Sequence, residues 1–117
     1  WIDCLFNSKT TPRKLDWINR MQKAGLMQNA RMTGSNIDYS AKVAEGRGHY
    51  QLTDAVGGYF DLCGCVLVEE AGGAMVNIKG ERPRPGDQVA IAVANPRDLE
   101  AVLKITQESY RDYAGFR

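Results

Sequence analysis

The stretch DAVGGYFDLCGCVLVEEAGG, residues 54–73, places one aspartate between an aromatic pair and a run of small apolar residues. Inside this stretch, Gly57-Gly58 and Gly72-Gly73 stand on either side of residues 59–71, a pattern that predicts a compact helix open to close approach by a neighbour. Asp61 precedes the apolar run, where a carboxylate caps a helix by accepting backbone N–H bonds, an effect of about 1 kcal/mol. The same carboxylate can also hold a metal ion. The residues alone leave both roles open.

Three further helices are predicted by their start and stop signals. Thr11 as N-cap and Pro12 at the first helical position begin a helix that Gly25 ends. Its predicted buried face consists of Leu15, Ile18 and Met21. Ser35 precedes a second helix, whose predicted buried stripe is Ile37, Ala41 and Ala44. Asn95 and Pro96 begin the last helix, with a predicted apolar face of Leu99, Val102, Leu103 and Tyr110.

Short apolar segments alternate with these helices and predict strands. They are WIDCLF, ARMTGS, HYQLT, AMVNI and QVAIAVA, in residues 1–6, 30–35, 49–53, 74–78 and 88–94. The last strands are apolar enough to be buried on both faces. The fold class expected is therefore α/β, a layered domain with a central mixed sheet flanked by helices.

The composition bounds the possible classes of function. The chain has 117 residues, 44% of them hydrophobic and 25% charged, and a net charge of +1, which fits one globular domain spanning residues 1–117. The mixed charges argue against nucleic acid as the main partner, and the short apolar runs argue against a membrane. An odd count of three cysteines points to a reducing compartment, so we expect a cytoplasmic location. The first residue, Trp1, suggests a fragment of a longer protein.

Two ordered motifs resemble the inositol monophosphatase family of Mg²⁺-dependent phosphomonoesterases. In that family an Arg-x-x-Gly-Ser element opens a helix that ends in Val-Ala-x-Gly. The matching residues here are Arg31, Gly34, Ser35, Val43, Ala44 and Gly46. A Trp-Asp pair then opens a small-residue helix that ends in Glu-Ala-Gly-Gly, which corresponds to Phe60 and Asp61 followed by residues 70–73. The resemblance implies the C-terminal half of the inositol monophosphatase and sugar phosphatase fold.

The resemblance also implies a function and a set of site residues. It implies hydrolysis of a polyol or sugar phosphomonoester by metal-activated water, with Mg²⁺ stabilising the oxygen charges. Asp61 would be the catalytic metal ligand, because it matches the aspartate that follows the family's tryptophan. The small-molecule phosphate ester would lie against the residues Asp54, Gly34, Ser35 and Asn36.

Two departures from the family pattern define a second reading. An alignment without gaps places Phe60, rather than Asp61, at the family's metal aspartate. The family's Asp-Pro-x-Asp-Gly-Thr element, which holds most of the metal, has no counterpart here and belongs to the N-terminal half. We therefore expect that half to be a partner, this chain alone to be inactive, and its exposed apolar face to favour a homo-oligomer, a dimer. The alternative is a catalytically degenerate, phosphatase-like binding or regulatory domain.

Overall fold

The computed structural model describes residues 2–3, 11–33, 36–53 and 59–111, in which helices and strands alternate as predicted. In chain order the elements are β1 (Ile2–Asp3), α1 (Thr11–Lys23), β2 (Met32–Thr33), α2 (Asn36–Ala44), β3 (Tyr50–Thr53), α3 (Tyr59–Glu70), β4 (Ala74–Asn77), β5 (Ala90–Val93), the 3₁₀ turn η1 (Pro96–Asp98) and α4 (Leu99–Ser109). None of the helices in these ranges has the length and apolar content needed to cross a lipid bilayer.

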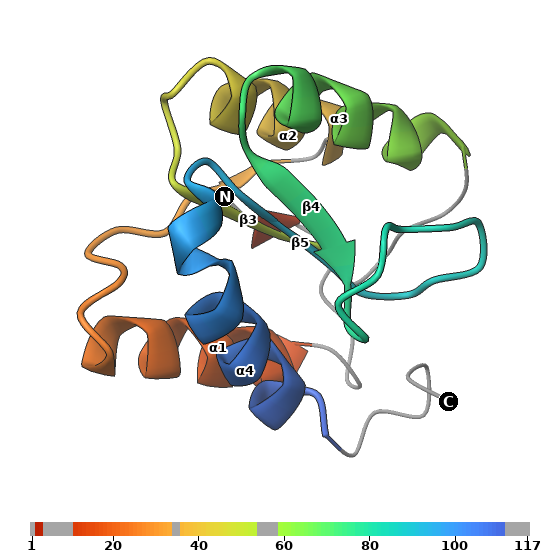
Figure 1. The fold of residues 1–117 in the computed structure, drawn as a ribbon. Helices are drawn as coiled ribbons and strands as arrows, with labels where there is room; N and C mark the ends of the chain where they lie inside the picture. The colour runs from red at the N-terminus through yellow and green to blue at the C-terminus, as the bar shows by residue number, and fades with distance from the viewer. Residues whose placement is uncertain (1, 4–10, 34–35, 54–58, 112–117) are drawn as a thin grey trace.

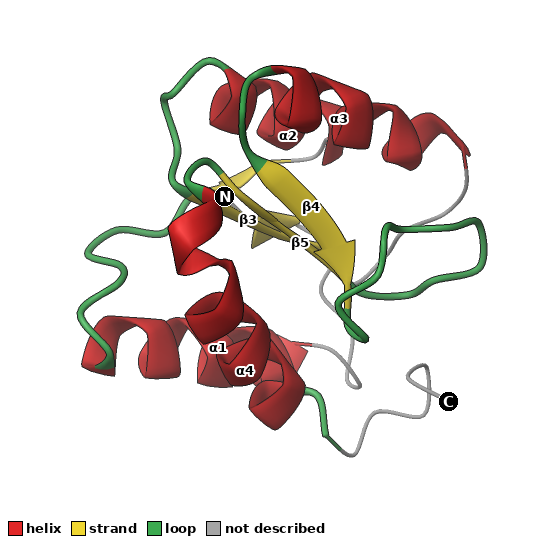
Figure 2. Ribbon diagram, viewed as in Figure 1, coloured by secondary structure: helices red, strands yellow, loops and turns green. Residues whose placement is uncertain are grey.

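The strands form one mixed sheet in the order β2-β1-β3-β5-β4. β1 pairs in parallel with both β2 and β3, whereas β5 pairs antiparallel with β3 and β4. Helices α2 and α3 cover one face of this sheet, and α1 and α4 cover the other (Figures 1 and 2). The layered α/β fold with a central mixed sheet is therefore confirmed.

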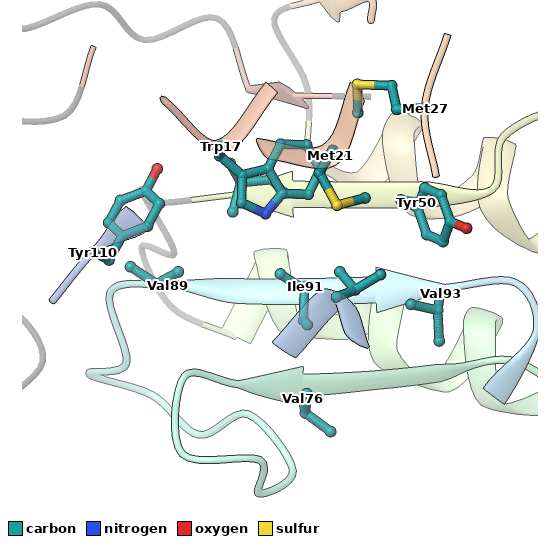
Figure 3. Close-up of a cluster of buried hydrophobic side chains, with 11 residues drawn as sticks. Trp17, Met21, Met27, Tyr50, Val76, Val89, Ile91, Val93 and Tyr110 are labelled. Atoms are coloured by element: carbon teal, nitrogen blue, oxygen red, sulfur yellow. The ribbon is translucent and has the colours of Figure 1, made fainter. Parts of the chain in front are cut away.

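The two faces of β5 carry side chains of different size. Ile91 and Val93 belong to the larger core cluster with Trp17 of α1 and Tyr110 beyond α4 (Figure 3). Ala90 and Ala92 belong to a second cluster, with Val43, Cys65 and Val68 of α2 and α3. Because side chains alternate across a strand, one four-residue segment supplies both cores. The small alanine side chains let α2 and α3 approach the sheet closely.

The predicted buried face of α1 is wrong in part. Met21 is buried and Ile18 is half-buried, but Leu15 is 56% exposed, and the fully covered residues are Lys14, Trp17 and Met21. Trp17 sets the orientation of α1 about its own axis, because its indole Nε1 donates a hydrogen bond to Thr106 Oγ1 of α4 at 2.9 Å. Adjacent helical residues point about 100° apart, so a helix oriented by Trp17 turns Leu15 outward.

The predicted stripe of α2 also differs from the structure. The buried residues are Tyr39, Ser40 and Val43, whereas Ala41 and Ala44 are half-buried and the side chain of Ile37 lies outside the described residues. A serine takes a core position because its hydroxyl donates to Oε1 of the buried Gln51 on β3 at 2.8 Å. Apolar periodicity alone cannot identify such a pair of buried polar residues.

The last helix is confirmed in its start and its buried face. The Asn95 side chain accepts a hydrogen bond from the backbone N–H of Arg97, and Pro96 occupies the first turn. This turn is 3₁₀, after which α4 continues with Val102 and Tyr110 fully buried and Leu99 and Leu103 packed against the same core.

Candidate active site at the carboxyl edge of the parallel strands

The parallel strands bring two segments of the predicted site to one edge of the sheet. β1 lies between β2 and β3, with Asp3 opposite Thr33 and Ile2 opposite Leu52. Parallel strands share a direction, so the carboxyl ends of β2 and β3, at Thr33 and Thr53, lie at the same edge. In α/β folds this edge is where ligands bind.

The predicted site residues fall in or beside the segments that follow these strand ends. Asn36 is the first residue of α2 and Asp61 is the third residue of α3, but their side chains lie outside the described residues. Gly34, Ser35 and Asp54 also lie outside the described residues. Their part in binding substrate, and that of Asp61 in holding metal, therefore stay predictions.

The predicted cap at Asp61 is corrected by the start of α3. The helix begins at Tyr59, so Asp61 belongs to its first turn rather than to the position before it. Tyr59 and Phe60 therefore adopt helical backbone, which their sequence as an aromatic pair did not indicate. A carboxylate in the first turn is still favoured by the positive end of the helix dipole.

A close contact fixes the starts of α2 and α3 relative to each other. A Cβ built at Gly64 of α3 would overlap the hydroxyl of Ser40 on α2, so only glycine fits there. Ser40 and Gly64 lie four and five residues from their helix starts, roughly 6 and 7.5 Å along each axis. The two helix starts therefore lie at similar distances from the point where the helices cross. The contact at Gly64 also confirms the predicted close approach of α3 to a neighbour.

The arrangement of the two helix starts favours an anionic group. The backbone N–H groups in the first turn of a helix have no partner within the helix and point along its axis beyond the N-terminus. The positive end of the helix dipole at the same place attracts negative charge. Both α2 and α3 begin at the edge that follows Thr33 and Thr53. This edge can therefore accept a phosphate.

Farther along α3, a polar cluster holds the β4–β5 connection. The thiol of Cys65 donates to Glu69 Oε1 at 3.1 Å, and Arg82 binds both oxygens of Glu69 at 3.0 and 3.3 Å. Burial and the Glu69 hydrogen bond raise the pKa of Cys65. The hydrogen bond from Cys65 and the contacts of Arg82 lower the pKa of Glu69. Of the cysteines in the described residues, Cys65 is buried and Cys63 is exposed.

The described residues do not fit a metal ion by themselves. Within residues 2–3, 11–33, 36–53 and 59–111, no three His, Cys, Asp or Glu residues cluster in a way that could hold one. Asp61 would offer a single carboxylate, and one carboxylate leaves Mg²⁺ largely hydrated. Any Mg²⁺ site would need further ligands from outside the described residues.

Sequence reasoning missed a cavity at the opposite edge of the parallel strands. Its volume is about 530 Å³, and it is lined by the connection before β2 and the connection before β3. The signal in the sequence was the placement of Arg31, Arg47 and His49 just before these two strands.

The fold is shared with solved inositol monophosphatases. An IMPase (inositol monophosphatase) of Thermotoga maritima matches 95% of this chain with a TM-score of 0.77 and 22% identity. SaIMPase-II with inositol monophosphate bound matches 92% with a TM-score of 0.68 and 18% identity. No protein-family model matches the chain, and comparison with curated protein sequences finds no match either. This chain covers only 41% and 43% of those two structures, so it has a partial inositol monophosphatase-like fold.

Proposed function

We propose that this chain is the C-terminal part of a Mg²⁺-dependent phosphatase that hydrolyses a phosphomonoester of a polyol or sugar. The observation that carries the proposal is the carboxyl edge of β2 and β3. Helices α2 and α3 begin at this edge, in a fold that resembles two inositol monophosphatases, and this supports the proposal. The N-terminal half of the same protein would supply the remaining metal ligands. On this proposal the chain alone is inactive.

In this proposal the chain's own residues bind and orient the substrate. The starts of α2 and α3 supply backbone N–H groups for the phosphate, and Asp54, Gly34, Ser35 and Asn36 contact the polyol. Asp61 supplies one carboxylate to a Mg²⁺ ion shared with the missing half. The Ser40–Gly64 contact keeps the two helix starts in register.

The test requires the longer protein that contains the upstream half. Asp61→Asn should then lower Mg²⁺-dependent phosphate release from inositol monophosphate by orders of magnitude, because a ligand to the metal loses its charge. Glu100→Gln is the matched control, since Glu100 is an exposed residue of α4, on the other face of the sheet, and should leave the rate unchanged. An unchanged rate in Asp61→Asn would contradict the metal role of Asp61.

A second candidate function follows from the continuity of α3. The helix runs without interruption from Tyr59 to Glu70, so its first turn holds both Phe60 and Asp61. If the alignment without gaps is right, Phe60 occupies the ligand position and the protein is a degenerate phosphatase that binds a ligand or a partner.

One substitution separates the two candidates. In a degenerate protein, Phe60→Asp should create Mg²⁺ binding that the unmodified full-length protein lacks, measurable by calorimetric titration. In an active enzyme, Asp61 already supplies the carboxylate, so Phe60→Asp should create no new Mg²⁺ binding.

A further inference from the structure

The cavity at the amino edge of the parallel strands is built from two connections. One is residues 25–29 and 31, between α1 and β2, and the other is residues 47–49 together with Tyr50, the first residue of β3. In Figure 1 these connections, orange and yellow, lie on the same side of the molecule, away from the start of α3. The cavity of about 530 Å³ is large enough for a small organic ligand. It is separate from the candidate active site.

The charged residues that line the cavity are two arginines. Arg31, Arg47 and His49 line it, and none of its described lining residues is an Asp or Glu. Arg47 makes an ion pair with Glu45 through Nε at 3.3 Å, with both side chains more than half exposed. Such surface pairs contribute little, about 0–1 kcal/mol, so a bound anion can compete with Glu45. The guanidinium fork suits the geometry of a phosphate.

Part of the lining, beside the polar Gln28 and Asn29, is apolar and held in place. Met27 and Tyr50 are buried and Leu26 is half-buried. The Tyr50 hydroxyl donates to Asp98 at 3.2 Å, which holds the Tyr50 ring in place. The centres of the His49 and Tyr50 rings lie 6.0 Å apart, and the ring planes are tilted by 43°. A ligand with a hydrophobic part would therefore meet a preformed wall.

The backbone of both connections is also anchored before any ligand binds. The N–H of Leu26 donates to the carbonyl of Met21, and the N–H of Ala94 donates to the carbonyl of His49. Gly25 has a φ of +74°, which lets the chain turn out of α1 at this point. Because the backbone is held in advance, its ordering adds little to the cost of binding.

We propose that this cavity binds a small phosphorylated molecule with an aromatic or apolar portion, at a second site distinct from the candidate active site. The phosphate is held by Arg47 and Arg31. The apolar portion packs against Met27 and Tyr50. The site requires neither Mg²⁺ nor the N-terminal half, so it goes beyond the proposed phosphatase function.

The test is an NMR titration of this chain with two probes, phenyl phosphate and inorganic phosphate. Phenyl phosphate should shift the amide signals of residues 25–31 and 47–50, and it should bind about threefold to tenfold more tightly than inorganic phosphate, because only the ester contacts the apolar wall. Arg47→Gln should weaken phenyl phosphate binding about tenfold through loss of a charge-assisted contact. Arg111→Gln, an exposed arginine beyond α4, should leave the affinity unchanged.

Several results would overturn the proposal. Shifts confined to the starts of α2 and α3 would place the anion at the candidate active site instead. Equal weakening by Arg47→Gln and Arg111→Gln would indicate general surface charge, and so would equal affinity for the two probes. Thermal unfolding of each variant checks that a lost signal does not reflect lost fold. Phosphatase activity of the longer protein is a separate measurement, so failure of one proposal leaves the other standing.

Discussion

At the scale of single residues, the indole of Trp17 joins two helices far apart in sequence. Its Nε1 donates to Thr106 Oγ1, and that hydroxyl donates in turn to the carbonyl of Val102 at 2.7 Å. Both side chains are fully buried. A buried polar atom costs little while it is bonded and much when its partner is removed.

Replacing Thr106 tests this bond. Thr106→Val keeps the size of the side chain but leaves the indole N–H without its acceptor, so the free energy of unfolding should fall by about 1–3 kcal/mol. Thr106→Ser keeps the hydroxyl and should lose less. Urea denaturation measures both variants. Equal losses in the two would mean that the methyl group, rather than the hydrogen bond, matters at this position.

The carboxylate of Glu69 predicts a dependence of stability on acid. Its pKa lies below the ordinary 4.5, because Cys65 donates to it and Arg82 contacts it. A lowered pKa in the folded state means stability that is present above about pH 4.5 and is lost as pH falls through the folded pKa. Glu69→Gln should therefore reduce the loss of stability between about pH 5 and pH 3.

The matched control for this pH profile is the neighbouring residue. Glu70 is exposed at the end of α3, and Glu70→Gln should leave the acid slope close to that of the unmodified chain. Chemical denaturation at a series of pH values supplies the profiles. Identical slopes in the two variants would show that the Cys65–Glu69–Arg82 cluster contributes nothing to acid stability.

At the scale of elements, the crossing of α2 and α3 depends on one glycine. Gly64→Ala would drive a methyl group into Ser40, and overpacking of this kind typically costs about 1–3 kcal/mol. The paired variant Ser40→Gly/Gly64→Ala removes the obstructing side chain. A double-mutant cycle in urea should therefore show favourable coupling between the two substitutions. Additive effects of the two substitutions on the free energy of unfolding would mean that the Ser40 side chain does not limit the approach of α3 to α2.

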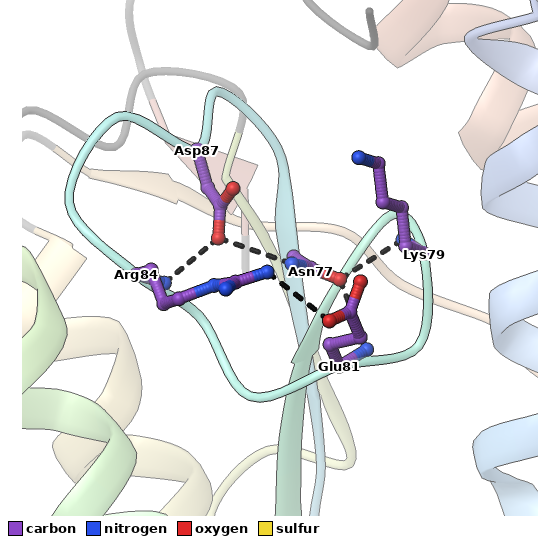
Figure 4. A network of polar contacts seen from close by, with 5 residues as sticks. All are labelled: Asn77, Lys79, Glu81, Arg84 and Asp87. Atoms are coloured by element: carbon purple, nitrogen blue, oxygen red, sulfur yellow. Dashed lines mark hydrogen bonds and ion pairs between the residues drawn. The ribbon is translucent and has the colours of Figure 1, made fainter.

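The connection between β4 and β5 is organised by the buried Asn77 (Figure 4). Its side-chain oxygen accepts from the backbone N–H of Lys79 and of Glu81, both at 3.0 Å, and its amide donates to Asp87 at 3.1 Å. The same Asp87 oxygen accepts from the backbone N–H of Arg84 at 2.7 Å. The Asn77 side chain thus supplies hydrogen-bond partners to the turn that leads from β4 back to β5.

Removing the Asn77 side chain should loosen this turn. Asn77→Ala should cost about 1–3 kcal/mol and speed amide hydrogen exchange at residues 79 and 81, because both N–H groups lose their acceptor. Arg84→Ala is the control, since it removes only an exposed ion pair with Glu81 and keeps the backbone bond to Asp87. Equal exchange rates in both variants would argue against the role of Asn77.

At the scale of the whole molecule, α3 presents apolar side chains to solvent. Val66 is 51% and Leu67 is 44% exposed, on the side of α3 turned away from the sheet. An exposed apolar face of this kind marks a contact surface. On the proposed function, the N-terminal part of a longer protein would pack against this surface.

This surface should make the isolated chain self-associate. Sedimentation velocity should show a sedimentation coefficient that rises with concentration, and the variant Val66→Lys/Leu67→Lys should reduce the rise. Leu15→Lys is the control, since Leu15 is 56% exposed but lies on α1, across the sheet. A monomer at high concentration in the unmodified chain would contradict the prediction.

The kind and order of the elements follow from the sequence alone, because caps, prolines and glycines act within a few residues. Asn95 and Pro96 were sufficient to place the start of the last helix, and apolar runs were sufficient to place β4 and β5. The ordered motifs also led to the fold of the inositol monophosphatases, which the structural comparison then supported.

The buried sides of the helices and the position of the cavity depend instead on long-range packing. Trp17 turns Leu15 outward through a partner 89 residues away, and Ser40 is buried because of Gln51 on another element. The cationic cavity likewise joins two connections that are separate in sequence. Periodicity reports on neighbours along the chain, whereas these features arise from contacts between distant segments that form only when the sheet and both helix layers pack together.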